Sequence, residues 1–244
     1  MKINFCLLIV IVLSDTCSFP ESFPALYTFD KVCSFENELE IKGSVVFEMV
    51  NNSSFRPNQK TTVKESAQFI MKSNSFIEAM WDFKVDNGGY LKLESNSKIY
   101  SDRMLFLGTN SRIHLYNNSE IYMGGYFYIY WSGSVELFDN SVMRDVGYIY
   151  AFGDSSIILN GNSQFKTKAL CNLQSIQVKV NDNSCFYTPT FSLYNNGILV
   201  VNSTFKKNSF EVVDFSMDVA SGQIIGISYI KVSSKTNLKN VIFE

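Results

Sequence analysis

The chain has 244 residues, of which 46% are hydrophobic and 15% are aromatic. This composition supplies enough apolar material for the core of one or two ordinary domains. The 21 basic and 23 acidic residues leave a formal net charge of −2 at pH 7. A chain with so little net charge has no general positive field for phosphate groups, which excludes nucleic-acid binding as its main role.

Residues 1–18 have the composition of a secretory signal peptide. Lys2 supplies the positive start, and a short apolar run from Phe5 to Leu13 is followed by small or polar residues. The run is too short to cross a bilayer as a stable helix, and no later segment is long and apolar enough to do so. We therefore predict an extracellular or cell-surface protein.

The cysteines are few after this segment. Removal of Cys6 leaves Cys33, Cys171 and Cys185, together with Cys17 if cleavage precedes it. An oxidising destination permits disulfides, but these spacings define no pairing. Cys171 falls in an apolar column of the repeat described below, so we expect it to be a buried apolar side chain.

Residues 19–44 fit no repeat and are predicted to form an N-terminal cap. They include a break at Phe23-Pro24 and two strand-like stretches, Leu26 to Phe29 and Leu39 to Ile41. A cap at this place would cover the backbone groups that the first unit of a stack leaves unpaired.

A repeat of 22 residues runs from Phe47 to Phe165 without a slip. Each unit holds an apolar pair spaced two apart, then Asn-Ser and an apolar residue, then a second apolar pair. The first apolar position reads Phe47, Phe69, Leu91, Ile113, Val135 and Ile157, and the Asn-Ser pairs begin at Asn52, Asn74, Asn96, Asn118, Asn140 and Asn162. A fixed period of this length indicates stacked supersecondary units.

The spacing of two within each apolar group is the period of a β-strand. Gly, Asn, Ser and Asp crowd the joints, where turns need them. Three short strands per coil form an all-β parallel β-helix, or β-solenoid, which chain chirality predicts to be right-handed. We expect about eight to nine coils over residues 45–232, with residues 233–244 as the end of the last coil or a cap.

A leucine-rich repeat is the alternative, because Leu115-x-x-Asn118-x-x-Ile121 fits one form of its strand segment. The position three before Ile113 is Asn110 rather than an apolar residue, however. The second half of each unit also has strand spacing, and the residues after Gly124 have poor helix propensity. The β-helix is therefore favoured.

Beyond Phe165 the coils continue with small deletions. One coil is expected to place Val178 and Val180 inward, and the next Ile198 and Val200. Third-face pairs are expected at Phe191 with Leu193 and at Val213 with Phe215. The last coil lacks an obvious cap, so end-to-end association through it is a further expectation.

The repeated Asn is predicted to form a ladder of stacked side chains at one turn. Each amide is expected to donate to the backbone of one neighbouring coil and to accept from the other, and the Ser is expected to add a weaker local bond. Four glycosylation sequons begin at Asn51, Asn52, Asn117 and Asn202. Asn51 and Asn117 precede the stacked Asn, so we expect glycans on these two residues only.

The chain resembles the parallel β-helix repeat proteins, the architecture of pectin lyases and of many secreted β-solenoids, over roughly Val45 to Val232. Enzymes of that class use aspartate clusters, or calcium-binding carboxylates with a basic proton acceptor, on one strand face. Here no two carboxylates fall adjacent in the predicted outward columns, so no catalytic residue is carried over. His114, the single histidine, is expected on a solvated face between Lys92 and Glu136. We expect no cofactor and no metal site.

The third face carries the one unusual surface. Outward aromatic positions there are Tyr126, Tyr128, Tyr130, Tyr148 and Tyr150, with Trp131 at the rim. Stacked rings on adjacent strands stabilise a sheet. An exposed plate of tyrosines also suits a sugar ring or another protein. The sequence leaves these two interpretations open.

The functional prediction is a non-enzymatic, secreted or cell-surface structural or adhesion-type protein. One alternative is a carbohydrate-binding module that uses the tyrosines on an extracellular polysaccharide. The other is a divergent polysaccharide lyase or glycoside hydrolase, which would need long loops to build a cleft. Constant coil length argues against such loops.

Overall fold

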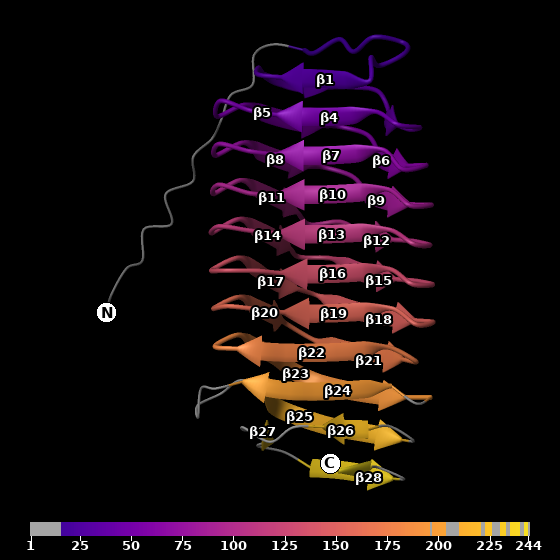
Figure 1. Ribbon diagram of the computed structural model, residues 1–244, viewed down its shortest axis with the longest axis vertical. Coiled ribbons are helices and arrows are strands. Elements are labelled where there is room, and N and C mark those ends of the chain that lie inside the picture. Colours follow the sequence, from indigo (N-terminus) through magenta and orange to yellow (C-terminus); the bar gives the residue numbers. More distant parts are fainter. Residues whose placement is uncertain are drawn as a thin grey trace, which may run out of the picture.

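A computed structural model describes residues 16–195, 197–203, 210–220, 223–225, 230–232, 235–239 and 242–243. Most of the predicted signal segment lies outside the described residues. Figure 1 shows a column of stacked coils. The fold is a parallel β-solenoid of about 8 turns with a period near 22 residues. The described part of the chain contains no helix. The predicted all-β fold is thus confirmed, and the leucine-rich alternative with its helices is excluded.

One strand of every coil belongs to an 11-stranded parallel sheet, here the first sheet. Its strands, in spatial order, are β1 (Leu26–Phe29), β4 (Val46–Met49), β7 (Gln68–Met71), β10 (Tyr90–Leu93), β13 (Arg112–Leu115), β16 (Ser134–Leu137), β19 (Ser156–Leu159), β22 (Gln177–Asp182), β24 (Ile198–Ser203), β26 (Gln223–Ile225) and β29 (Ile242–Phe243). Partners in the regular region are one coil apart, as in Leu91 with Ile113.

The other two strands of each coil form a second and a third face. The second face comprises β2 (Val32–Phe35), β5 (Ser54–Pro57), β8 (Phe76–Ala79), β11 (Lys98–Ser101), β14 (Glu120–Met123), β17 (Val142–Val146), β20 (Gln164–Thr167) and β27 (Ile230–Val232). The third face comprises β3 (Leu39–Ile41), β6 (Thr61–Lys64), β9 (Phe83–Asp86), β12 (Leu105–Leu107), β15 (Tyr126–Ile129), β18 (Tyr148–Phe152), β21 (Leu170–Gln174) and β28 (Lys235–Lys239).

Two long strands join these faces. β23 (Cys185–Tyr194) pairs with β20 through its first half and with β21 through its second half. β25 (Phe210–Ala220) continues both pairings, with a register shift between Thr188 and Thr190 of β23. The corner between the second and third faces is therefore lost in the last coils, and the two faces merge into one 18-stranded sheet.

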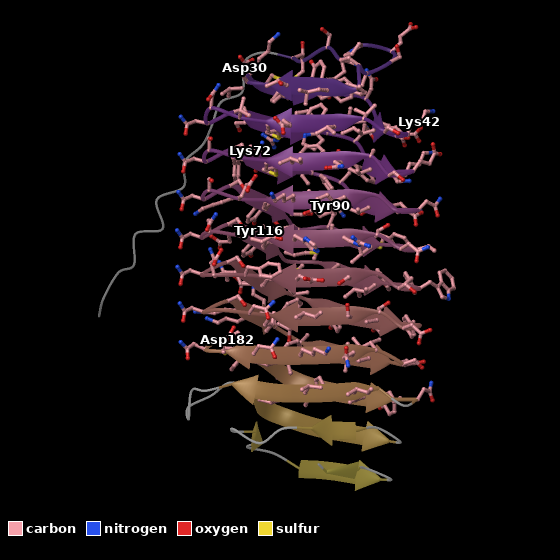
Figure 2. All side chains as sticks on the ribbon, in the orientation of Figure 1. Asp30, Lys42, Lys72, Tyr90, Tyr116 and Asp182 are labelled. Atoms are coloured by element: carbon pink, nitrogen blue, oxygen red, sulfur yellow. A yellow bond between two sulfur atoms is a disulfide. The ribbon has the colours of Figure 1, made fainter. Side chains whose placement is uncertain are left out.

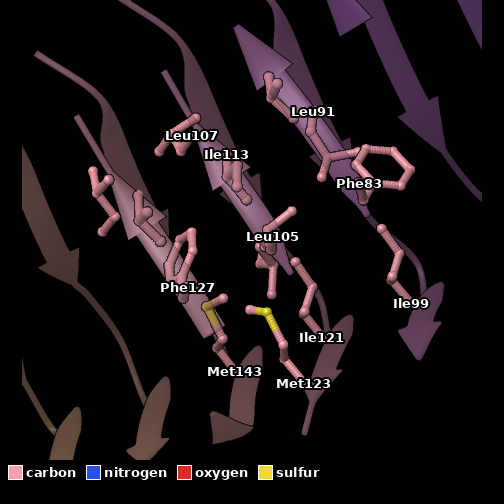
Figure 3. Packing of buried hydrophobic residues seen from close by; sticks show 14 of the residues in the cluster. Phe83, Leu91, Ile99, Leu105, Leu107, Ile113, Ile121, Met123, Phe127 and Met143 are labelled. Carbon is pink, nitrogen blue, oxygen red and sulfur yellow. The ribbon is translucent and has the colours of Figure 1, made fainter. Parts of the chain in front are cut away.

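The core lies between the three faces. Inward side chains from successive coils stack in columns, and Figure 3 shows them interdigitating around Leu105, Ile113 and Phe127. Phe47, Phe69 and Leu91 of the first sheet are completely buried. Burial of each such side chain stabilises the fold by about 1.5–3 kcal/mol. Because the period is constant, every coil adds a similar layer to one continuous core.

The turns between strands use left-handed backbone, which explains their composition. Asn51 and Asn52 have φ of 56° and 58°, and Asn117 and Asn118 have φ of 49° and 60°. Two consecutive residues with positive φ are typical of tight type I′ turns, which favour Asn, Asp and Gly. The main reason for asparagine at these turn positions is thus the left-handed backbone conformation, which asparagine adopts more readily than most residues.

The two members of each Asn-Ser pair have different environments. Ser97 and Ser119 are buried, and their hydroxyls donate to main-chain oxygens of the preceding coil at 3.2 Å. The exposed amides of Asn74 and Asn96 donate to the side-chain oxygen of the equivalent Asn one coil earlier, at 3.0 and 3.1 Å. The expectation that the amides donate to the backbone is wrong. The turn carbonyls already accept from backbone N–H groups of the neighbouring coil, as that of Ser95 does from Asn74, so the amides stack on one another instead.

The segment assigned to the N-terminal cap contains a coil of its own. β1, β2 and β3 pair in parallel with β4, β5 and β6 and extend all three faces by one layer. The covering group is Phe19, whose ring contacts those of Phe35 and Phe55 at 4.8 and 5.6 Å. A disulfide between Cys17 and Cys33 attaches this cover to β2.

Two expectations for the C-terminal coils are wrong by one or more residues. Val178 pairs with Leu199 rather than Ile198, so Leu199 and Val201 point inward and are completely buried. This coil is one residue shorter than the regular period, not two residues shorter as the expectation assumed. A shift of one residue along a strand moves every side chain to the opposite face of the sheet. On the third face, Phe191 pairs with Met217 instead of Val213, since the register shift in β25 adds residues at the lost corner.

Candidate functional site

The structure brings together all six predicted aromatic residues of the third face. Tyr126 and Tyr128 lie on β15, Tyr148 and Tyr150 lie opposite them on β18, and Tyr130 and Trp131 follow β15. We call these six residues the aromatic plate: Tyr126, Tyr128, Tyr130, Trp131, Tyr148 and Tyr150. Their inward neighbours are buried, so strand alternation alone directs the tyrosines outward.

The rings of the plate stack on one another. Tyr126 and Tyr148 have ring centroids 5.1 Å apart with 18° between the planes, and Tyr128 and Tyr150 repeat this at 5.5 Å and 16°. Two coplanar rings in edge-to-edge contact cannot have centroids this close together, because the hydrogens on their edges would overlap. The rings are therefore offset-stacked. A large part of each face is covered by a neighbouring ring, and the edges remain for contact with solvent.

Exposure differs across the plate. Trp131 is 64% exposed, Tyr126 45% and Tyr148 40%, whereas Tyr128, Tyr130 and Tyr150 are half-buried between them. Burial raises the pKa of the Tyr128 and Tyr130 hydroxyls. Among the described residues none of the five tyrosine hydroxyls has a hydrogen-bond partner. The plate thus presents unengaged phenol groups at its surface.

Polar side chains end the stack on both sides. The ammonium of Lys84, one coil before, lies 4.7 Å from the centre of the Phe106 ring, which in turn contacts Tyr130. One coil after, Asn172 follows Tyr150 in the outward column. The plate is therefore a bounded patch rather than a face-long stripe.

Trp131 occupies the corner between the third face and the first sheet. Its backbone φ is 38°, and its ring lies 5.6 Å from Tyr130, tilted by 36°. The neighbouring coil has Gly153 at this point, where any Cβ would lie only 3.0 Å from the indole. A glycine in the left-handed conformation thus makes room for the most exposed ring of the plate.

A second group of side chains surrounds His114 on the first sheet. As predicted, Lys92 and Glu136 flank it on adjacent coils. The hydroxyl of Tyr90 lies 3.1 Å from Nδ1 of His114, and that of Tyr116 lies 3.4 Å away. Figure 2 shows the two tyrosines on successive coils of this sheet. Sequence reasoning missed both, although the pairing of Tyr90 with Arg112 beside the histidine column follows from the same repeat.

His114 is a partly buried side chain with a hydrogen-bond partner at one ring nitrogen and none at the other. Nδ1 lies within hydrogen-bond distance of the Tyr90 hydroxyl, whereas Nε2 faces Glu136 at 3.8 Å, too far for a hydrogen bond. Burial, with Arg112 and Lys92 nearby, holds the pKa of His114 below its usual value despite the opposing effect of Glu136. The neutral form of the imidazole is therefore favoured at pH 7, with Nδ1 beside a phenol hydroxyl and Nε2 without a hydrogen-bond partner.

A hollow of about 470 Å³ lies beside this group at the corner with the third face. Tyr90, Arg112, His114 and the Gly88-Gly89 pair are among the residues that line it. No carboxylate is among the lining residues. The paired acid and base that glycoside hydrolysis needs are therefore not present in this hollow.

The second face carries ion pairs. Glu120 bridges Lys98 on one adjacent coil and Arg144 on the other. Tyr100 and Tyr122 stack beside them with centroids 4.4 Å apart, and the Tyr100 hydroxyl donates to Asp102. Each exposed ion pair of this kind contributes little to stability. The alternation of positive and negative side chains on successive coils is typical of a solvated surface.

In the part of the chain that the structure describes, no three His, Cys, Asp or Glu side chains gather closely enough to hold a metal ion. No helix there is long and apolar enough to span a membrane.

The glycosylation sequons lie at the corner between the first sheet and the second face. Asn51 and Asn117 are exposed at this corner. Asn52 is exposed as well, but its side-chain oxygen accepts from Asn74. The side chain of Asn202 lies outside the described residues. This corner is the one that does not border the third face, so glycans here would leave the aromatic plate uncovered.

No known protein family, curated protein or solved structure matches the chain in sequence or structure comparisons.

Proposed function

We propose that the protein is a secreted, non-enzymatic β-solenoid of the structural or adhesion type, and that it contacts its partner through the aromatic plate. The observation that carries this proposal is the bounded stack of tyrosines with unengaged hydroxyls on an otherwise charged, ion-paired surface. Exposed aromatic patches of this kind mark interaction sites more often than chance surfaces do.

Three further features support the proposal. The apolar run of residues 1–18 is that of a signal peptide, and the Cys17–Cys33 disulfide fits an oxidising compartment. Sequons at Asn51 and Asn117 face away from the plate, as expected of a glycoprotein whose binding face must stay open. The stacked coils present the rings on a rigid support, which lowers the entropy that binding costs.

A carbohydrate-binding module is the second candidate, and Trp131 is the observation that favours it. Sugar rings bind on the open face of an aromatic side chain, and Trp131 is the ring of the plate with the largest exposure, 64%. The tyrosines cover one another's faces and suit this role less well. In this alternative Trp131→Ala abolishes binding to a polysaccharide, whereas the tyrosine substitutions leave most of it.

The proposal is tested with beads that carry the purified protein and are scored for attachment to the cells that produce it. We expect the double variant Tyr126→Ser, Tyr148→Ser to lose attachment while its melting temperature stays near that of the wild type. The matched control is Tyr100→Ser, Tyr122→Ser, which removes a stacked pair from the second face and should keep attachment. Equal attachment of both variants would overturn the proposal.

The same proteins on a glycan array separate the two candidates. Binding to defined glycans that depends on Trp131 supports the carbohydrate module. Attachment to cells without binding to any glycan supports adhesion to a surface protein. Turnover of a polysaccharide by the wild-type protein would instead support the divergent lyase or hydrolase.

A further inference from the structure

The plate holds phenol rings from two adjacent coils in direct contact. Tyr126 and Tyr148 are partners in the strand register, their centroids are 5.1 Å apart, and both are exposed. Tyr128 extends the contact to Tyr126 and Tyr150, at 6.0 and 5.5 Å. Such closeness of exposed phenols on rigid neighbouring strands has a chemical consequence that does not depend on any binding partner.

One-electron oxidation of a tyrosine removes an electron and the hydroxyl proton and leaves a phenoxyl radical. The unpaired electron is shared by the oxygen and the ring carbons beside it. Two such radicals in contact combine by forming a bond between these ring carbons, and the hydrogens on the joined carbons then move to the oxygens. Both phenols are restored, and the pair has lost two hydrogen atoms in total.

We propose that the aromatic plate is a site of oxidative modification, at which Tyr126 and Tyr148 become joined through a carbon–carbon bond when hydrogen peroxide and a haem peroxidase act on the protein. One molecule of peroxide accepts the two hydrogen atoms and becomes two molecules of water, so the reaction balances. The product is a covalent link between two successive coils.

Exposure singles out this pair within the plate. Tyr126 and Tyr148 are the most exposed tyrosines of the plate, so an oxidant reaches them directly. Like those of the other three tyrosines of the plate, their hydroxyls have no hydrogen-bond partner among the described residues, so no such bond opposes a small rotation that brings the reactive carbons together. The half-buried Tyr128 and Tyr150 pass a radical to the exposed pair through the stack.

The second face provides an internal comparison. Tyr100 and Tyr122 are closer, with centroids 4.4 Å apart. The charged groups of Arg144 and Lys168 lie 5.6 and 5.3 Å from the centre of the Tyr122 ring, however. Positive charge over a ring opposes the loss of an electron from it. The Tyr100 hydroxyl is also held by Asp102 at 3.0 Å. We therefore expect this pair to stay unlinked.

The test treats the purified full-length protein, at a dilution that disfavours contact between molecules, with horseradish peroxidase and hydrogen peroxide. Trypsin separates the two tyrosines, because Arg144 lies between them and the flanking peptides are 113–144 and 145–166. We expect dityrosine fluorescence, and these two peptides joined with the loss of two hydrogen atoms, in the monomer. Fragmentation should place the link at Tyr126 and Tyr148.

Tyr148→Phe keeps the stacked ring but removes the phenol, and should lose this joined peptide pair. Tyr150→Phe and the second-face variant Tyr100→Phe should keep it. The proposal is overturned if Tyr148→Phe retains the link, if the joined peptides are 99–103 and 113–144, or if links form only between molecules. It is equally overturned if no link forms while the same enzyme couples free tyrosine in the mixture.

Discussion

The Asn-Ser pairs divide two tasks between adjacent residues at one corner. The serine points inward, and in Ser97 and Ser119 its hydroxyl satisfies a main-chain oxygen that the solenoid buries. The asparagine adopts a left-handed backbone conformation, and its amide donates to the equivalent Asn of the preceding coil at the surface. Since an exposed amide competes with water, the contact between amides contributes less than the backbone conformation does.

Substitution of Asn96 separates these two contributions. Asn96 has φ of 62°, and its amide donates to Asn74 at 3.1 Å. Asn96→Gly loses the amide but accepts the conformation, so we expect little change in stability. Asn96→Ala loses both and should destabilise by about 1 kcal/mol, because alanine lacks the short polar side chain by which asparagine offsets the strain of a Cβ at positive φ. Urea unfolding measures the difference; equal losses in the two variants would assign the role to the amide instead.

His114 makes stability depend on pH. Burial lowers its folded pKa, aided by Arg112 and Lys92, while Glu136 opposes the shift and Tyr90 occupies Nδ1. The unfolded chain therefore binds the proton more readily. The stability due to this group is complete above the unfolded pKa of about 6.5 and is lost as pH falls through that value toward the folded pKa.

Because the chain has one histidine, the assignment is direct. We expect the free energy of unfolding to fall between pH 7.5 and pH 5.5, and His114→Gln to flatten this part of the profile. Carboxylates titrate lower and contribute to both proteins alike. A decline of the same size in the variant would place the effect elsewhere.

At the scale of the element, β15 shows how one strand serves both core and surface. Phe127 and Ile129 point inward and are completely buried, while Tyr126 and Tyr128 point outward into the plate. The inward residues stabilise the fold by leaving water. The outward residues add the smaller attraction between stacked rings, which frees them for binding or modification.

Adjacent substitutions in β15 should therefore have unequal costs. Phe127→Ala leaves a cavity in the core and should destabilise by about 3–5 kcal/mol. Tyr128→Ala should cost about 1 kcal/mol, since it removes ring contacts on a surface that stays solvated. Chemical denaturation of the two variants compares them. A loss for Tyr128→Ala as large as that for Phe127→Ala would mean that the plate is chiefly a structural element.

The N-terminal coil depends on a covalent element. The Cys17–Cys33 disulfide holds Phe19 over the end of the core, so under the proposed secretion the mature chain must retain Cys17. We therefore expect signal cleavage before Cys17, earlier than the boundary at residue 18 inferred from composition. Trypsin without reductant should give a peptide of residues 32–42 joined to the N-terminal peptide. Recovery of 32–42 alone, with an N-terminus after Cys17, would contradict this.

At the scale of the whole molecule, the 22-residue period predicted the fold correctly in the coils where that period is constant. The inward columns from Phe47 to Phe165 follow from spacing alone, as do the plate and the positions of Lys92 and Glu136 on either side of His114. The spacing did not predict which residues face inward near Leu199, because the length of the deletion in that coil was unknown. It also did not predict the loss of the corner at β23, where the second and third faces join. It also could not reveal that the rings stack, because ring orientation depends on side-chain rotamers.

If nearest-neighbour stacking holds the solenoid together, one coil can be removed without loss of the fold. Deletion of residues 91–112 takes out 22 residues and joins Tyr90 to Ile113, where the register already makes Tyr90 equivalent to Arg112. We expect a folded, shorter protein with unchanged β-sheet circular dichroism per residue and a denaturant m-value lower by roughly a tenth.

Deletion of residues 91–111 is the matched control. It differs by one residue, but it shifts the following coils by one position against the preceding ones and turns their apolar columns outward. This variant should unfold or aggregate, because at the new junction the inward-facing residues of one coil pair with the outward-facing residues of the next. If both deletions fold equally well, the coils do not depend on a common register, and the constant period has another cause.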